Sequence, residues 1–109
     1  MKPKTLSELN ERLVKEFMDV LVLSLLNNGH PIGGYDVIKF IYKKFHILMS
    51  SGTVYSALYS LERSELIKGN WTQKKRVYML TERGKETLEE LLNEKESVQA
   101  LITNFIRNI

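Results

Sequence analysis

Hydroxyl and cationic side chains form two short clusters whose chemistry suits phosphate groups. Ser50, Ser51 and Thr53 lie at the start of a run with helical spacing. Hydroxyls and free backbone N–H groups at a helix start can hold an anion, although capping alone would explain the same residues. Lys74, Lys75 and Arg76 lie between two β-prone runs, and they favour contacts with phosphate over a merely solvated turn.

The charge of this 109-residue chain is only +3 in total, but it is unevenly placed. Residues 39–85 carry ten basic and three acidic groups, whereas residues 1–38 and 86–109 have net charges of −1 and −3. A basic centre between acidic flanks favours a polyanionic partner such as nucleic acid. Charge alone leaves open the alternative of a randomly solvated basic face.

Composition excludes several classes of site. The chain has no cysteine and two histidines, which rules out disulfides, thiolate metal sites and cysteine nucleophiles. Neither a nucleophile motif nor a phosphate-cradling glycine loop is present, so we expect no enzyme, no cofactor and no metal site. The longest apolar stretch, residues 17–26, is half of the roughly twenty residues that a membrane span needs. We therefore expect a cytoplasmic protein without a membrane partner.

Apolar spacing predicts the elements that position these clusters. Helices are expected over residues 6–28, 34–45 and 50–62, followed by a basic-tipped hairpin of residues 66–71 and 76–80. Thr81 is expected to start a last helix that reaches Ile109. In the third helix, the steps of three from Tyr55 to Leu58 and Leu61 predict an inward face, which would turn Val54, Ser56 and Ala57 outward.

The order helix, helix, helix, strand, strand, helix is typical of a winged helix-turn-helix. The predicted fold class is thus mainly α with a small β-hairpin, with residues 1–81 as the DNA-binding domain and 82–109 as a C-terminal dimerisation helix. A helix with a small polar outer face can enter the major groove, while a basic wing contacts phosphates or the minor groove.

The predicted DNA contacts divide by chemistry. Hydroxyls at the helix start would bind phosphate, and small outward residues would meet base edges unless they are simply solvated. Tyr55 combines a core ring with a hydroxyl that reaches phosphate, whereas Tyr59 either packs or contacts the DNA backbone. The full set is Ser50, Ser51, Thr53, Val54, Tyr55, Ser56, Tyr59, Lys74, Lys75 and Arg76.

The C-terminal segment carries a heptad seam. Its members alternate steps of three and four: Leu88, Leu91, Lys95, Val98, Ile102, Phe105 and Ile109. A helix over residues 82–109 would be about 40 Å long and would project from so small a domain. We expect a second copy of the chain on this seam, as a homodimer; packing against the chain's own first helix is the alternative.

Three segments together resemble the PadR family of transcriptional regulators: PIGGYDVIKFI, SSGTVYSALYSLERSELI and KKRVYMLTERGKETLEEL. The resemblance covers about residues 20–92. It departs from the family pattern at Gly33, Ser51, Ser56 and Glu65, and in a wing that is shorter and has no glycine at its tip.

The resemblance implies a dimeric, sequence-specific binder of double-stranded DNA, usually a repressor, that in many members responds to a small-molecule effector. A two-fold dimer would read an inverted-repeat operator with half-sites about 34 Å apart. The preferred effector pocket would lie between the first and last helices, near Phe17 and Phe105. The alternative function is a winged-helix module that binds protein without DNA.

Overall fold

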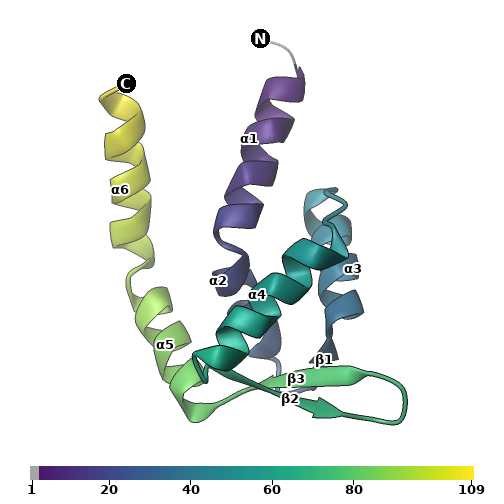
Figure 1. Ribbon diagram of the computed structural model, residues 1–109. Coiled ribbons are helices and arrows are strands. Elements are labelled where there is room, and N and C mark those ends of the chain that lie inside the picture. Colours follow the sequence, from purple (N-terminus) through teal and green to yellow (C-terminus); the bar gives the residue numbers. More distant parts are fainter. Residues whose placement is uncertain (1–2) are drawn as a thin grey trace.

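The computed structural model describes residues 3–109 (Figure 1). In chain order the elements are α1 (Pro3–Glu16), α2 (Met18–Leu26), β1 (Ile32–Gly33), α3 (Gly34–Phe45), α4 (Ser51–Arg63), β2 (Ile67–Trp71), β3 (Arg76–Leu80), α5 (Glu82–Asn93) and α6 (Lys95–Arg107). The strands form one antiparallel sheet in the order β1-β3-β2. The structure confirms the predicted class, a mainly helical winged helix-turn-helix with C-terminal helices.

The core lies where α2 meets α3, α4, α5 and the sheet. The α2 segment is apolar nearly all round, and a helix of that kind is stable only when it is enclosed. Val22 is fully buried, and Ile41 of α3 and Leu58 of α4 lie in the same core cluster. These contacts fix the two helices of the helix-turn-helix relative to each other.

The predicted helix over residues 6–28 is interrupted at Phe17. This residue leaves helical geometry, with φ −103° and ψ 28°, and it separates α1 from α2. The hydrogen bonds from Phe17 N to Leu13 O and from Leu21 N to Phe17 O persist, so the interruption is a kink and not a loop. Because α2 is held by the core while most of α1 is exposed, the kink lets α1 leave the domain.

The sheet has one strand that the sequence pattern did not indicate. Ile32 and Gly33, which lie between the first and second predicted helices, pair with Tyr78 and Val77 as β1. Two residues are too short to show strand alternation. The predicted hairpin is confirmed, and Thr72 closes its tip because its amide donates to the Lys75 carbonyl at 2.8 Å.

The last helix starts as predicted but does not run unbroken to the C-terminus. The Thr81 hydroxyl accepts a hydrogen bond from the Gly84 amide, which caps α5. Glu94, with φ −101° and ψ 13°, then separates α5 from α6. The surrounding residues 93–97 are polar and exposed, so no packing holds this stretch straight.

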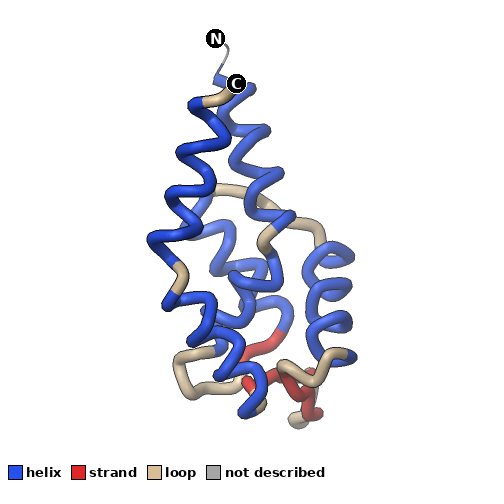
Figure 2. Tube along the Cα trace, turned by 90° about the vertical axis from the view of Figure 1, so that its left-hand side faces the viewer, coloured by secondary structure: helices blue, strands red, loops and turns tan. Residues whose placement is uncertain are grey.

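The helices α1 and α6 project from the domain toward the end that carries both termini, away from the wing (Figures 1 and 2). The radius of gyration is 15.3 Å, whereas a compact domain of this length would have about 13 Å. No helix in residues 3–109 is long and apolar enough to cross a membrane.

Candidate nucleic-acid interface

The start of α4 is an exposed, hydroxyl-capped helix end. The Ser50 hydroxyl accepts a hydrogen bond from the Thr53 amide at 3.2 Å and lies 2.9 Å from the Thr53 hydroxyl. This confirms Ser50 as the cap. Ser51 follows as the first helical residue, and its exposed side chain leaves it accessible to a ligand. The remaining free amides of the first turn give this end a partial positive charge.

Val54 does not lie on the outer face of α4, so the expectation that it meets base edges is wrong. Its side chain is fully buried, together with Leu58 and Leu61. At about 100° per residue, positions 54, 58 and 61 fall within about 60° of one another, whereas positions 55 and 61 are about 120° apart. The inward face therefore begins at Val54, and Tyr55 is turned toward the surface.

The outer face of α4 carries small hydroxyl residues and a row of larger side chains. Ser56 is exposed, as predicted, and Ala57 is half-buried. Tyr55 and Tyr59 are 46% and 64% exposed, and the Arg63 guanidinium lies 5.7 Å from the centre of the Tyr59 ring. Arg63 was not among the site residues predicted from the sequence. The four-residue spacing of Tyr55 and Tyr59 continues to Arg63 and could have indicated it.

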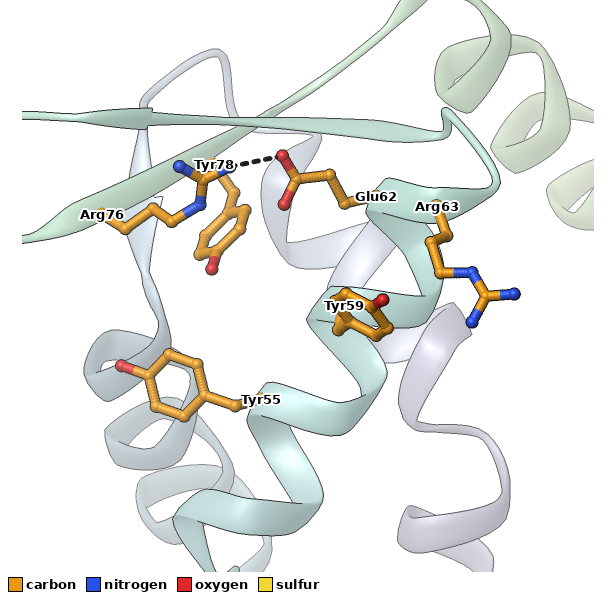
Figure 3. Close-up of a pocket in the computed structure, with 6 residues that line it drawn as sticks. All are labelled: Tyr55, Tyr59, Glu62, Arg63, Arg76 and Tyr78. Carbon is orange, nitrogen blue, oxygen red and sulfur yellow. Dashed lines mark hydrogen bonds and ion pairs between the residues drawn. The ribbon is translucent and has the colours of Figure 1, made fainter.

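A groove of about 580 Å³ separates this row from the wing. Figure 3 shows the α4 side chains Tyr55 and Tyr59 facing Arg76 and Tyr78 of β3. Glu62 and Arg63 complete the lining. Burial raises the pKa of Tyr78 above its ordinary value. The groove thus joins the predicted recognition helix to the predicted wing.

Arg76 is engaged within the protein. Its Nη2 atom lies 2.5 Å from Oε2 of Glu62, and the same carboxylate oxygen accepts a hydrogen bond from the Gly69 amide at 3.2 Å. Both charged side chains are about one-third exposed. The predicted wing cation Arg76 therefore connects β3 to α4 in the free protein.

Lys75 is also paired, but more loosely. Its Nζ atom lies 3.3 Å from Oδ2 of Asp36, and the lysine side chain is 57% exposed. The Asp36 carboxylate also accepts the Gly33 amide at 3.0 Å at the start of α3. That backbone hydrogen bond, followed by Lys75, lowers the pKa of Asp36 below its ordinary value of 3.8. An exposed ion pair of this kind exchanges readily for another anion.

Lys74 lies at the tip of the wing with an exposed side chain, and no ion pair involves it in the described part of the chain. Other exposed cations lie along α3. Lys39 and Lys44 are within 5.2 Å and 5.5 Å of the ring centres of Tyr35 and Phe40. Several cations of the basic centre seen in the sequence are therefore exposed on α3 and the wing.

A second surface lies at the opposite end, between α1 and α6. It is an apolar groove of about 950 Å³ lined by Leu6, Leu9, Leu13, Phe17, Ile102, Phe105, Ile106 and Ile109, with Ser7 and Asn10. Sequence reasoning missed Ile106 in this surface. Ile106 directly follows the predicted seam residue Phe105, so a prediction that included the neighbouring apolar positions of the heptad would have found it.

The predicted dimer seam divides into two parts. Leu88 is 2% exposed and lies in the subunit's own core, so its assignment to a dimer interface is wrong. The cause is Gly84, four residues earlier, which brings this turn of α5 close to the Leu66 backbone. The remaining members are exposed: Leu91, Lys95, Val98, Ile102, Phe105 and Ile109.

No group of three or more histidine, aspartate or glutamate side chains in the described residues has a geometry that could hold a metal ion. Two exposed surfaces are candidate interfaces: the basic, aromatic face of α4 and the wing, and the apolar groove between α1 and α6.

Residues 22–90 match the transcriptional regulator PadR-like family. No curated protein matches the chain. Among solved structures, a PadR family regulator from Clostridium difficile is 27% identical, with a TM-score of 0.72 over 83% of this chain and 98% of that one. A PadR family regulator from Eggerthella lenta has a TM-score of 0.78 at 22% identity, over 97% and 96% of the two chains.

One similar structure contains nucleic acid. Bacillus subtilis PadR in complex with operator DNA is 23% identical, with a TM-score of 0.63 over 69% of this chain and 46% of that chain. At this identity the similarity shows a shared fold.

Proposed function

Because the chain belongs to the PadR-like family of transcriptional regulators, we propose that it binds double-stranded DNA sequence-specifically, as a dimeric repressor. Membership in a family of regulators agrees with the expectation that the chain is not an enzyme. The observation that carries the proposal is the groove shared by α4 and the wing, which places aromatic hydroxyls and cations of two elements on one surface.

The face of α4 supports a division between positioning and readout. Ser50, Ser51 and the first-turn amides would hold a phosphate at the helix start. Ser56 is small and exposed, so it would reach base edges in the major groove. Tyr55, Tyr59 and Thr53 would add backbone contacts from the same helix. These contacts are typical of a helix that lies in the groove by its N-terminal half.

The wing supports the same placement. Lys74 is exposed, and Lys75 would exchange its weak pair with Asp36 for a phosphate. The similar B. subtilis protein was crystallised with operator DNA, so this fold is compatible with a bound duplex. Arg76 would assist indirectly, because Glu62 engages it.

The apolar groove between α1 and α6 supports the proposed dimerisation. Leu9 and Leu13 are 50% and 53% exposed, and Phe105 is 71% exposed. A monomer rarely exposes a contiguous apolar surface of this kind to water. A second copy of the chain would cover it, and two recognition helices related by a two-fold axis would read an inverted repeat. A small-molecule effector stays a prediction of the family resemblance, and this groove is where it would bind.

The test is binding to duplex DNA over a range of salt concentrations. Two probes are needed: the promoter region of the gene that encodes this chain, and a random-sequence duplex of equal length. Phosphate contacts predict that log affinity falls linearly with log salt, and sequence specificity predicts tighter binding to one promoter site. Footprinting should then show two protected half-sites about 34 Å apart. Binding that is absent even at low salt would favour the protein-interaction module.

A further inference from the structure

We propose that Glu62 is a positioning residue for DNA binding: its carboxylate fixes the wing against the recognition helix through Gly69 and Arg76. This inference rests on the proposed function, since it assigns a role within the same surface. Two contacts of Glu62 carry it, one with each strand of the wing, and a third observation concerns the space that the Arg76 side chain occupies.

The first contact is with the edge strand. Because the sheet order is β1-β3-β2, β2 has no neighbour on its outer side. Outward backbone groups of an edge strand need another partner or water. The Gly69 amide finds its partner in Glu62 Oε2, at 3.2 Å. The recognition helix α4 thereby supplies a hydrogen bond that a further strand would otherwise make.

The second contact is with the adjacent strand. Arg76 of β3 donates to the same Glu62 oxygen at 2.5 Å, and its guanidinium lies 5.8 Å from the centre of the Tyr78 ring. A hydrogen bond between two charged groups is about twice as strong as one between neutral groups. One carboxylate therefore holds both strands of the wing to α4, as Figure 3 shows for Arg76.

The third observation explains how Arg76 reaches Glu62. A Cβ atom on Gly69 would lie 2.6 Å from Nε and 2.7 Å from Nη2 of Arg76. The absence of a side chain at this position opens the path that the guanidinium takes across β2. An alanine at position 69 would push the end of the arginine side chain aside without changing any charge.

These contacts predict that Glu62 strengthens DNA binding, whereas its negative charge alone would weaken DNA binding. An isolated carboxylate beside a DNA-binding surface repels phosphate, so its neutralisation should strengthen binding. If the carboxylate instead positions the wing, its neutralisation weakens the hold on both strands and lets the tip, including Lys74 and Lys75, shift away from the phosphates. The sign of the change in affinity therefore separates the two roles.

The experiment compares Glu62→Gln with Glu65→Gln in the full-length chain, with the promoter duplex and a salt series. Both variants remove one negative charge near the end of α4, but the Glu65 side chain makes no hydrogen bond or ion pair with other described residues. We expect Glu62→Gln to bind about fivefold more weakly, and its salt slope to become shallower by about 1 to 2, which corresponds to one or two lost phosphate contacts. Glu65→Gln should bind like the wild type or slightly more tightly.

Two further variants keep the test independent of folding. Gly69→Ala should weaken binding in the same direction as Glu62→Gln, because it displaces Arg76 at constant charge. The double variant Glu62→Gln, Arg76→Gln should bind no more weakly than the weaker of its two single variants, since both residues act through one contact. Thermal unfolding followed by circular dichroism verifies that each variant is folded.

The possible failures are distinguishable. A wild type that binds DNA, together with a folded Glu62→Gln variant of equal or higher affinity and unchanged salt slope, overturns this inference alone. Additive losses in the double variant also overturn it. Absence of duplex binding by the wild type overturns the proposed function and, with it, the role of Glu62.

Discussion

Gly34, the first residue of α3, lies directly against the ring of Tyr55 on α4. A Cβ atom on Gly34 would lie 2.6 Å from Tyr55 Cε1, closer than carbon atoms pack in proteins. Tyr55 also lines the groove beside the wing. The absence of a side chain at position 34 therefore determines where an aromatic ring of the candidate DNA-binding surface lies.

We predict that Gly34→Ala destabilises the protein by about 1–3 kcal/mol, the usual cost of added volume at a packed contact. Tyr55 must rotate outward, so duplex binding should weaken as well. Urea unfolding and a binding titration measure the two effects. Gly52→Ala is the control for folding, because a Cβ atom at this exposed helical position has no neighbour within 4 Å. A Gly34→Ala variant as stable as the wild type would contradict the contact.

The end of α4 offers a stabilising substitution. Glu65 adopts a left-handed conformation, with φ 63°. The Leu66 amide donates to the Leu61 carbonyl and the Glu65 amide to the Glu62 carbonyl, both at 3.0 Å, which is the hydrogen-bond pattern of a Schellman motif. Glycine is the residue that most easily adopts this conformation.

Glu65→Gly should therefore raise the free energy of unfolding by about 1 kcal/mol, the approximate cost of a left-handed conformation for a residue with a side chain. The expected readout is a higher urea midpoint with an unchanged m-value. Duplex affinity should stay near that of the wild type. If stability falls, the motif does not form in solution.

We predict that the carboxylate of Asp36 makes the stability of the protein depend on pH. Its pKa is lowered by the Gly33 amide first and by Lys75 second. A carboxyl group whose pKa is lower in the folded state stabilises the folded protein at pH values above its ordinary pKa. This stabilisation is lost as the pH falls through the folded-state pKa.

Asp36→Asn should hence be less stable than the wild type at pH 7, with a difference that shrinks as the pH is lowered below 3.8. The effect should be small, because the side chain is 39% exposed and solvent screens the pair. Thermal unfolding of both proteins at a series of pH values measures it. A difference that stays constant with pH would show that the carboxylate charge is not involved.

Val54 and Ser56 are two residues apart on α4, but we expect their substitution by alanine to affect different properties, stability for Val54 and sequence preference for Ser56. Val54 is fully buried, whereas Ser56 is exposed. Val54→Ala should destabilise the protein by about 2 kcal/mol through the cavity it leaves, without a change in sequence preference. Ser56→Ala should leave stability nearly unchanged and alter the preference among promoter variants. Selection from a random duplex library compares the two, and a changed preference for Val54→Ala alone would reverse the assignment.

The sequence predicted the elements well but placed some residues on the wrong face. Hydrophobic spacing located α3, α4 and the hairpin because each has a regular pattern and a clear end, such as the Ser50 cap. The same spacing placed Val54 on the wrong face of α4. A helix that packs against two neighbouring elements buries a wide stripe of side chains, and three positions are too few to locate the centre of that stripe. The contacts of Glu62 and Asp36 join segments far apart in the chain, and no local pattern indicates such pairs.

Substitutions at Phe105 and Leu88 test which part of the heptad seam forms the interface of the proposed dimer. Phe105 is 71% exposed within one subunit, so a charge there should not disturb the fold of the monomer. Phe105→Glu should convert the proposed dimer to a monomer, because a carboxylate would have to be buried in an apolar interface without a partner. Light scattering or sedimentation measures the mass in solution.

Two variants separate association from folding. Thr103→Glu adds the same charge about 200° around α6 from Phe105, so it should leave the dimer intact. Leu88→Ala should lower the free energy of unfolding by about 2–5 kcal/mol, because it leaves a cavity in the subunit core, and the folded protein should still be dimeric. If Phe105→Glu remains a dimer while Leu88→Ala becomes a folded monomer, the interface lies on α5, and the groove between α1 and α6 must have another occupant.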